Sequence, residues 1–205
     1  MNQMTQITSN DLEALIKSNP NGIVLLEGRR NIPNEFAAKA ESLARSLALK
    51  YPNLRFRSGN ANGTDEAFSK GVASVDPSRL HVVAPYASHR KKFRYAGAVY
   101  DSPETLTQVE EDTVAYKTSA ASPKAKGLVS SLGKKGAAGA KAAYLIRDTM
   151  KVTGYSADFQ KPICALFYVD PSDPLAGGTG HTIRVCQQEG VPFAFQESWA
   201  EWLRS

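Results

Sequence analysis

Three glycine-rich segments carry the side chains best suited to binding an anion. The first is Gly28-Arg29-Arg30, the second runs from 58 to 65 as SGNANGTD, and the third runs from 173 to 182 as DPLAGGTGHT. Glycine lets the backbone approach a ligand closely and adopt positive φ. A helix that begins after such a segment offers free N–H groups and the positive end of its dipole. Together the segments predict a binding site for a phosphate-bearing ligand.

Each segment contributes residues to this expected site. Arg29 and Arg30 could bind a phosphate through paired hydrogen bonds, or form ion pairs on the surface. Asp65 could accept a hydrogen bond from a ribose hydroxyl, or place its charge at a helix N-terminus. The full expected set is Gly28, Arg29, Arg30, Ser58, Gly59, Asn60, Gly63, Thr64, Asp65, Gly177, Gly178, Thr179, Gly180 and Thr182.

Several common functional motifs are absent from the sequence. No glycine-rich segment continues as the Gly-Lys-Ser/Thr of a P-loop, and none forms GxGxxG with an acidic residue about 20 positions later. No GxSxG turn of a serine hydrolase occurs. The three histidines and two cysteines do not have the spacing of metal ligands. We therefore expect no metal and no cofactor, and we expect Cys164 and Cys186 to be buried free thiols.

Apolar runs alternate with amphipathic ones along most of the chain. The runs predict strands at 23–26, 54–57, 80–84, 163–169 and 191–195, and helices at 9–18, 33–51, 66–74, 104–117, 140–154 and 182–188. Because strands and helices alternate, the sequence predicts an α/β fold, with a Rossmann-like open, mostly parallel sheet and helices on both faces. The carboxyl ends of its strands would bring the glycine-rich segments together. Trp199 and Trp202 are expected to pack a short terminal helix, or to form a subunit contact.

The middle of the chain is basic and has no clear strand pattern. Between Asp112 and Asp148 there is no acidic residue, and a second basic cluster spans 89–94 as HRKKFR. We expect a basic insert or loop at about 86–139, with a mobile loop at 119–139. Such a surface could bind single-stranded nucleic acid, or serve only for solubility.

The three segments, in this order, resemble the pattern of the SLOG superfamily, which includes DprA (Smf), the LOG-type phosphoribohydrolases and the small YspA-like proteins. The second segment is similar to that family's SGGARGxD turn, with Asn60 in place of a glycine, and the third is similar to its PGGxGT turn. The resemblance covers about 23–84 and 140–195 and is nearest to the YspA-like group. It implies a nucleotide site with Gly59, Asn60, Gly63 and Thr64 on one side and the third segment holding phosphate on the other.

The resemblance also raises the question of catalysis. LOG-type enzymes cleave the N-glycosidic bond of nucleoside monophosphates. Arg147 could match their helix arginine, or be an exposed helix charge that pairs with Asp148 or Lys151. Their glutamate is missing, because IRVC follows Thr182 and Glu189 lies too far along. His181 could serve as an acid or base, or be a structural residue. We therefore hypothesise a binding or sensor protein for a nucleotide-type ligand, with a LOG-like phosphoribohydrolase and a DprA-like single-stranded DNA binder as alternatives.

Length and composition agree with a globular protein. The chain has 205 residues, a net charge of +5, 42% hydrophobic and 22% charged residues. These values exclude a wholly disordered, collagen-like or coiled-coil chain. No apolar run reaches the length of a membrane span, and the first 15 residues lack a signal-peptide pattern. We expect a single cytoplasmic domain over residues 1–205 that does not bind membranes, and a homodimer is reasonable.

Overall fold

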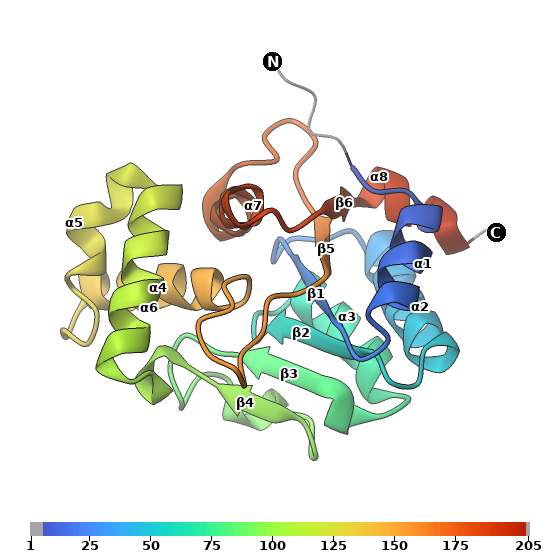
Figure 1. The fold of residues 1–205 in the computed structure, drawn as a ribbon, viewed down its shortest axis with the longest axis horizontal. Helices are drawn as coiled ribbons and strands as arrows, with labels where there is room; N and C mark the ends of the chain where they lie inside the picture. The colour runs from blue at the N-terminus through green and yellow to red at the C-terminus, as the bar shows by residue number, and fades with distance from the viewer. Residues whose placement is uncertain (1–5, 204–205) are drawn as a thin grey trace.

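The computed structural model describes residues 6–203 and contains, within that range, one sheet of six parallel strands (Figure 1). Residues 1–5, which begin the segment tested for a signal peptide, and residues 204–205 lie outside the described range. The strands are β1 (Ile23–Gly28), β2 (Arg55–Gly59), β3 (Leu80–Val83), β4 (Val99–Asp101), β5 (Cys164–Tyr168) and β6 (Phe193–Phe195). Their order is β4-β3-β2-β1-β5-β6, so the order reverses between β1 and β5. The predicted Rossmann-like α/β fold is confirmed.

Helices cover both faces of the sheet (Figure 1). One face packs against α1 (Ser9–Ser18), α2 (Asn34–Lys50), α3 (Thr64–Ala73) and α8 (Gln196–Trp199), and the other against α4 (Gln108–Ala121), α6 (Ala137–Met150) and α7 (Gly177–Glu189). Alternation along β1 explains the division, since Val24 and Leu26 join the first apolar core while Leu25 packs with residues of α7. An open sheet covered on both faces leaves the ends of its strands for binding.

Trp199 has the packing role expected of it. Its side chain is fully buried, and its indole N–H donates to the carbonyl oxygen of Phe167 at 2.9 Å. Cys164 and Cys186 are free and buried, as predicted. Among residues 6–203, no helix is long and apolar enough to cross a bilayer.

The expected mobile loop at 119–139 is wrong. The segment contains the end of α4, the short α5 (Lys126–Val129) and the start of α6. Alanine and lysine favour helices, and Val114 and Val129 are buried in a core shared with α6. The preceding segment also adds the edge strand β4, where no strand was predicted.

The last glycine-rich segment is helical further upstream than predicted. α7 begins at Gly177 rather than at Thr182, so its glycines form the first turns of the helix. Gly180 is needed there for space, because a Cβ atom would overlap the backbone of Leu175. Glycine disfavours helices, so its presence at 177–180 predicts a loop. Tertiary packing overrides this low helix propensity here.

Candidate functional site

A cleft of about 450 Å³ lies beyond the carboxyl ends of β1 and β2, where the strand order reverses. Segments from four parts of the chain form its walls. Its lining residues are Glu27, Gly28, Arg29, Arg30, Asn31, Ala61, Asp65, Tyr144, Arg147, Asp148, Ala176, Gly177, Gly178 and Thr179. Ligands of open parallel sheets bind at this kind of position.

A cavity of similar volume, about 480 Å³, lies elsewhere around Arg57. The Arg57 guanidinium stacks under the ring of Phe159 at 3.9 Å and donates to the carbonyl oxygens of Lys151 and Gln160. It therefore ties the segment around Phe159 to the sheet. No residue of the glycine-rich segments lines this cavity, so we assign the candidate site to the first cleft.

The cleft brings together part of the predicted ligand-binding set. Residues from the first and third segments meet there, together with Asp65 from the second and Arg147 from α6. The predicted residues in its lining are Gly28, Arg29, Arg30, Asp65, Arg147, Gly177, Gly178 and Thr179. Arg29 also pairs with Asp170 at the rim.

The other predicted residues lie behind the cleft and support its walls. Ser58 donates to the Leu26 carbonyl oxygen at 2.7 Å, and Thr64 donates to that of Arg29 at 2.7 Å. Thr182, a residue of α7, is fully buried. The predicted residues that support the walls without lining the cleft are Ser58, Gly59, Asn60, Gly63, Thr64, Gly180 and Thr182.

Two glycines of the second segment are required by close approaches. A Cβ atom at Gly59 would overlap the side chains of Arg147 and Asp65, so only glycine lets these two charges meet in front of β2. Gly63 has a φ of 84° and its Cα faces the backbone of Arg30. Both glycines therefore shape the cleft by making room for neighbouring residues. Neither of them lines the cleft.

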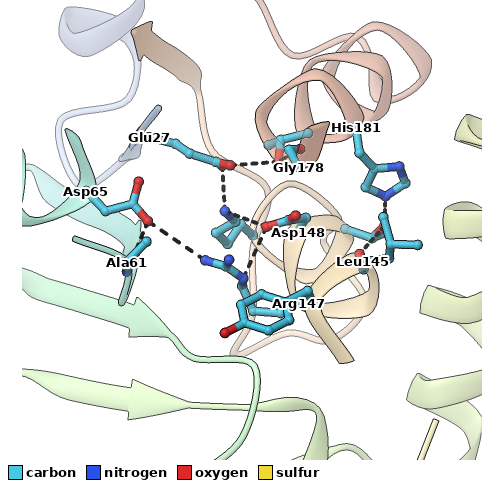
Figure 2. A network of polar contacts seen from close by, with 12 residues as sticks. Glu27, Ala61, Asp65, Leu145, Arg147, Asp148, Gly178 and His181 are labelled. Carbon is cyan, nitrogen blue, oxygen red and sulfur yellow. Dashed lines mark hydrogen bonds and ion pairs between the residues drawn. The ribbon is translucent and has the colours of Figure 1, made fainter. Parts of the chain in front are cut away.

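Five buried charged side chains form a network of ion pairs, namely Glu27, Asp65, Arg147, Asp148 and Lys151 (Figure 2). All but Lys151 line the floor of the cleft. Lys151 Nζ lies 2.6 Å from Glu27 Oε2 and 2.9 Å from Asp148 Oδ1. Arg147 Nε lies 3.1 Å from Asp148 Oδ1, and Arg147 Nη1 lies 3.8 Å from Asp65 Oδ2. With three carboxylates against two cations, this buried charge cluster carries one net negative charge when every member is ionised.

Burial and neighbouring charges act in opposite directions on these groups. Burial raises the pKa of Glu27 to about 7, with Lys151 opposing the shift. Burial also raises the pKa of Asp65. Burial alone would raise the pKa of Asp148 too, but Arg147 and Lys151 hold it below its usual value. Asp148 is therefore the firm anion of the cluster, while Glu27 is poised to exchange a proton near neutral pH.

The N-terminus of α7 opens into the cleft without a side-chain cap. Gly177 has a φ of 63°, and no atom lies within 4 Å of the position its Cβ would take. The first N–H groups of a helix have no partner within the helix. Arg147 lines the same cleft and is 6% exposed, and its Nε and Nη1 have no partner with hydrogen-bond geometry. The Asp148 carboxylate also borders this end of α7, because its Oδ2 lies 2.9 Å from the position that a Cβ atom of Gly178 would take. This part of the cleft can accept an anion.

His181 lies outside the cleft, to one side of the charge cluster (Figure 2). Its Nδ1 is 2.8 Å from Ser122 Oγ, and its Nε2 is 2.9 Å from Thr149 Oγ1. Burial lowers its pKa to about 4. With both ring nitrogens engaged, His181 ties α7 to α4 and α6, and this position does not support the catalytic role considered for it.

The sequence reasoning missed four residues of this region, namely Glu27, Tyr144, Asp148 and Lys151. Glu27 directly follows the apolar run 23–26. A charged residue at the end of such a strand could have indicated a functional side chain. Asp148 and Lys151 lie one and four residues after Arg147, and were treated only as its exposed partners. Lys151 is instead fully buried.

The two basic clusters differ in exposure. In the 89–94 cluster, His89 is buried, Arg90 pairs with Glu66 at 2.8 Å, and Arg94 lies over the ring of Tyr100. In the later cluster the exposed lysines are Lys124, Lys126, Lys134, Lys135 and Lys141. Lys91 and Lys92 of the earlier cluster are exposed as well, so both clusters offer exposed lysines, and the later cluster offers more of them.

No family model, curated protein or solved structure matches this chain. The fold assignment rests on the strand order and on the helices covering both faces of the sheet. Within residues 6–203, no group of three or more His, Cys, Asp or Glu side chains forms a candidate metal site.

Proposed function

We propose that this chain binds a small phosphorylated ligand of nucleotide type in the cleft, as a SLOG-type protein would. The observation that carries the proposal is the uncapped N-terminus of α7, which opens into the cleft that the buried Arg147 also lines. Helix N-termini bind phosphate through free N–H groups and the helix dipole. Arg29 and Arg30 add positive charge at the rim.

The buried charge cluster sets the orientation of such a ligand. A net negative floor repels a phosphate, and Asp148 of that floor lies close to Gly178. The phosphate therefore belongs at the outer end of α7, near the open position of Gly177 and the rim arginines. Carboxylates accept hydrogen bonds from hydroxyl groups. Asp65 and Glu27, which line the floor, therefore suit the hydroxyls of a ribose. A ligand with a phosphate at one end and a sugar beside it fits both parts of the cleft.

The test uses a matched pair of substitutions at Gly177. Asn and Asp tolerate left-handed backbone better than other side chains, and the space around Gly177 is open. Gly177→Asp places a carboxylate at the helix N-terminus, and Gly177→Asn places a neutral group of the same size there. We expect nucleoside monophosphates, cyclic nucleotides or ADP-ribose to stabilise the wild type and Gly177→Asn in thermal-shift and calorimetric titrations, and to bind Gly177→Asp at least about tenfold more weakly. Equal binding by both variants, or no binding of any nucleotide to the folded wild type, would contradict the proposal.

A second candidate function is hydrolysis of an N-glycosidic bond, and the position of Glu27 favours it. The glutamate expected after Thr182 is missing, but the Glu27 carboxyl lines the cleft from the end of β1 and has a pKa near 7. In its ionised form Glu27 could take a proton from the attacking water as the new C–O bond forms and the C–N bond breaks, and that proton then passes to the nitrogen of the departing base. The carboxylates of Asp65 and Asp148 would stabilise positive charge on the sugar.

The hydrolase candidate is tested with the wild type and Glu27→Gln. We expect free base to be released from a nucleoside monophosphate by the wild type, and Glu27→Gln to bind the same compound but turn it over at least about 100-fold more slowly. Unchanged turnover in Glu27→Gln would remove Glu27 from the mechanism. Binding of nucleotides without any release of base would refute hydrolysis, and the binding proposal would still stand.

Single-stranded nucleic acid binding through the exposed lysines and formation of a homodimer stay predictions. Nucleic acid binding should weaken steeply as salt is raised. The double substitution Lys134→Glu and Lys135→Glu should reduce the affinity for single-stranded nucleic acid. An unchanged affinity would show that these lysines do not bind it.

A further inference from the structure

We propose that Tyr144 is the surface on which the planar ring of the ligand stacks, so that the cleft selects nucleotides over bare sugar phosphates. This inference rests on the proposed function and names the part of the ligand that the charge cluster and the α7 N-terminus leave unrecognised. Neither of those features contacts a nucleobase. An aromatic side chain in the same cleft could bind a base by stacking.

Tyr144 lies on α6 one helical turn before Arg147, so the two side chains share a face of the helix. Both line the cleft. Tyr144 is half-buried and belongs to none of the three apolar cores formed by the described residues. Its ring therefore faces the cleft rather than completing the interior of the protein.

Two arginines lie near the Tyr144 ring. The guanidinium carbons of Arg30 and Arg147 are 5.5 Å and 5.6 Å from its centroid. Arg147 is fixed by the buried charge cluster, whereas Arg30 is exposed and forms no ion pair with any described residue. Arg30 can therefore move aside and lie over a ring bound against Tyr144. Unstacked bases are commonly held between an aromatic ring and a guanidinium plane.

The orientation of Tyr144 is supported from outside the cleft. Its hydroxyl lies 3.3 Å from His89 Nε2, and the two rings meet edge to face with centroids 6.0 Å apart. The cleft volume of about 450 Å³ is within the usual range for a small-molecule site. A ligand with its phosphate at Gly177 and its ring on Tyr144 would thus use two walls of one cleft.

The test compares ribose 5-phosphate with ribonucleoside monophosphates, which share its ribose and phosphate and add a base. Affinities for ribose 5-phosphate and for the four common ribonucleoside monophosphates are measured by calorimetry with the wild type, Tyr144→Phe and Tyr144→Leu. Tyr144→Phe keeps the ring and loses only the contact with His89. Removing a stacking aromatic costs affinity by roughly 5- to 150-fold per base.

We expect the wild type to bind at least one nucleotide more tightly than ribose 5-phosphate. Tyr144→Leu should weaken that nucleotide by roughly 5- to 150-fold and leave ribose 5-phosphate unchanged, and Tyr144→Phe should alter neither. Equal weakening of both ligands by Tyr144→Leu, or equal affinity of the wild type for both, would overturn the inference while leaving the phosphate site standing. If neither ligand bound, the proposed function would fail as well.

A second variant keeps the test decisive if Tyr144→Leu does not fold. Tyr144→Trp retains an aromatic wall and adds a fluorophore in the cleft. Stacking of a base on it should quench the added fluorescence, and ribose 5-phosphate should not. Bound nucleotide without quenching would place the base elsewhere and overturn the inference.

Discussion

Replacing Glu27 by glutamine should change how the stability of the protein depends on pH. Burial raises the pKa of the Glu27 carboxyl from 4.5 to about 7, so the folded state binds a proton that the unfolded chain has released. The stabilisation is fully present below pH 4.5 and is lost as the pH rises through 7. A shift of this size corresponds to about 3 kcal/mol of unfolding free energy.

His181 acts in the opposite direction and masks this effect in the wild type. Burial lowers its pKa from 6.5 to about 4, so its contribution to stability is lost as the pH falls from 6.5 through 4. The two pH windows overlap, so the wild-type profile alone does not separate the groups. The difference between the wild type and Glu27→Gln isolates the carboxyl.

The assay is urea unfolding at pH 4.5 and at pH 7.5, followed by the fluorescence of the buried Trp199. Between pH 4.5 and pH 7.5 the wild type should lose the contribution of Glu27, and Glu27→Gln should not. The unfolding free energy of Glu27→Gln minus that of the wild type should therefore rise by about 3 kcal/mol between these two pH values. Parallel profiles would refute the reasoning, because they would mean that Lys151 outweighs burial and keeps Glu27 ionised throughout.

Three further outcomes follow from the same structure. Lys151→Met leaves buried carboxylates without their cation and should lower the unfolding free energy by about 3–5 kcal/mol in urea titrations, and adding Glu27→Gln should recover part of the loss. Gly180→Ala should lower the melting temperature more than Gly177→Ala, because the first overlaps backbone whereas the second meets only the cost of positive φ, about 1 kcal/mol; equal losses in differential scanning calorimetry would contradict this. His181→Gln should reduce the loss of stability between pH 6.5 and 4 by up to about 3 kcal/mol, and an unchanged acid profile would show that another group is responsible.

The alternation of strands and helices, and the position of the glycine-rich segments at the carboxyl ends of the strands, followed from local patterns in the sequence. Apolar runs such as 23–26 are buried on both faces, and their glycine-rich continuations fall at the carboxyl ends of a parallel sheet. Such patterns are carried by neighbouring residues, so a single sequence contains them. The third segment was expected near the cleft, and Gly177, Gly178 and Thr179 line it, although the helix begins at Gly177 and not at Thr182.

The features that escaped prediction depend on contacts between distant residues. Glu27 and Lys151 are far apart in sequence and are buried together only because β1 and the end of α6 bring their charged groups within 2.6 Å. The helices of the 119–139 segment are stabilised by a core shared with α6 rather than by a strong apolar period of their own. The edge strand β4 has three residues, too few for a clear alternating pattern.

The most direct test of the central claim is a nucleotide titration followed through the backbone amide resonances. If the cleft holds the phosphate of a nucleotide, the amide signals of Gly177, Gly178 and Thr179 should shift together and saturably, with those of residues 28–30. Shifts confined to the exposed lysines of α5 and α6, or no shifts at these amides while a nucleotide binds, would contradict the account.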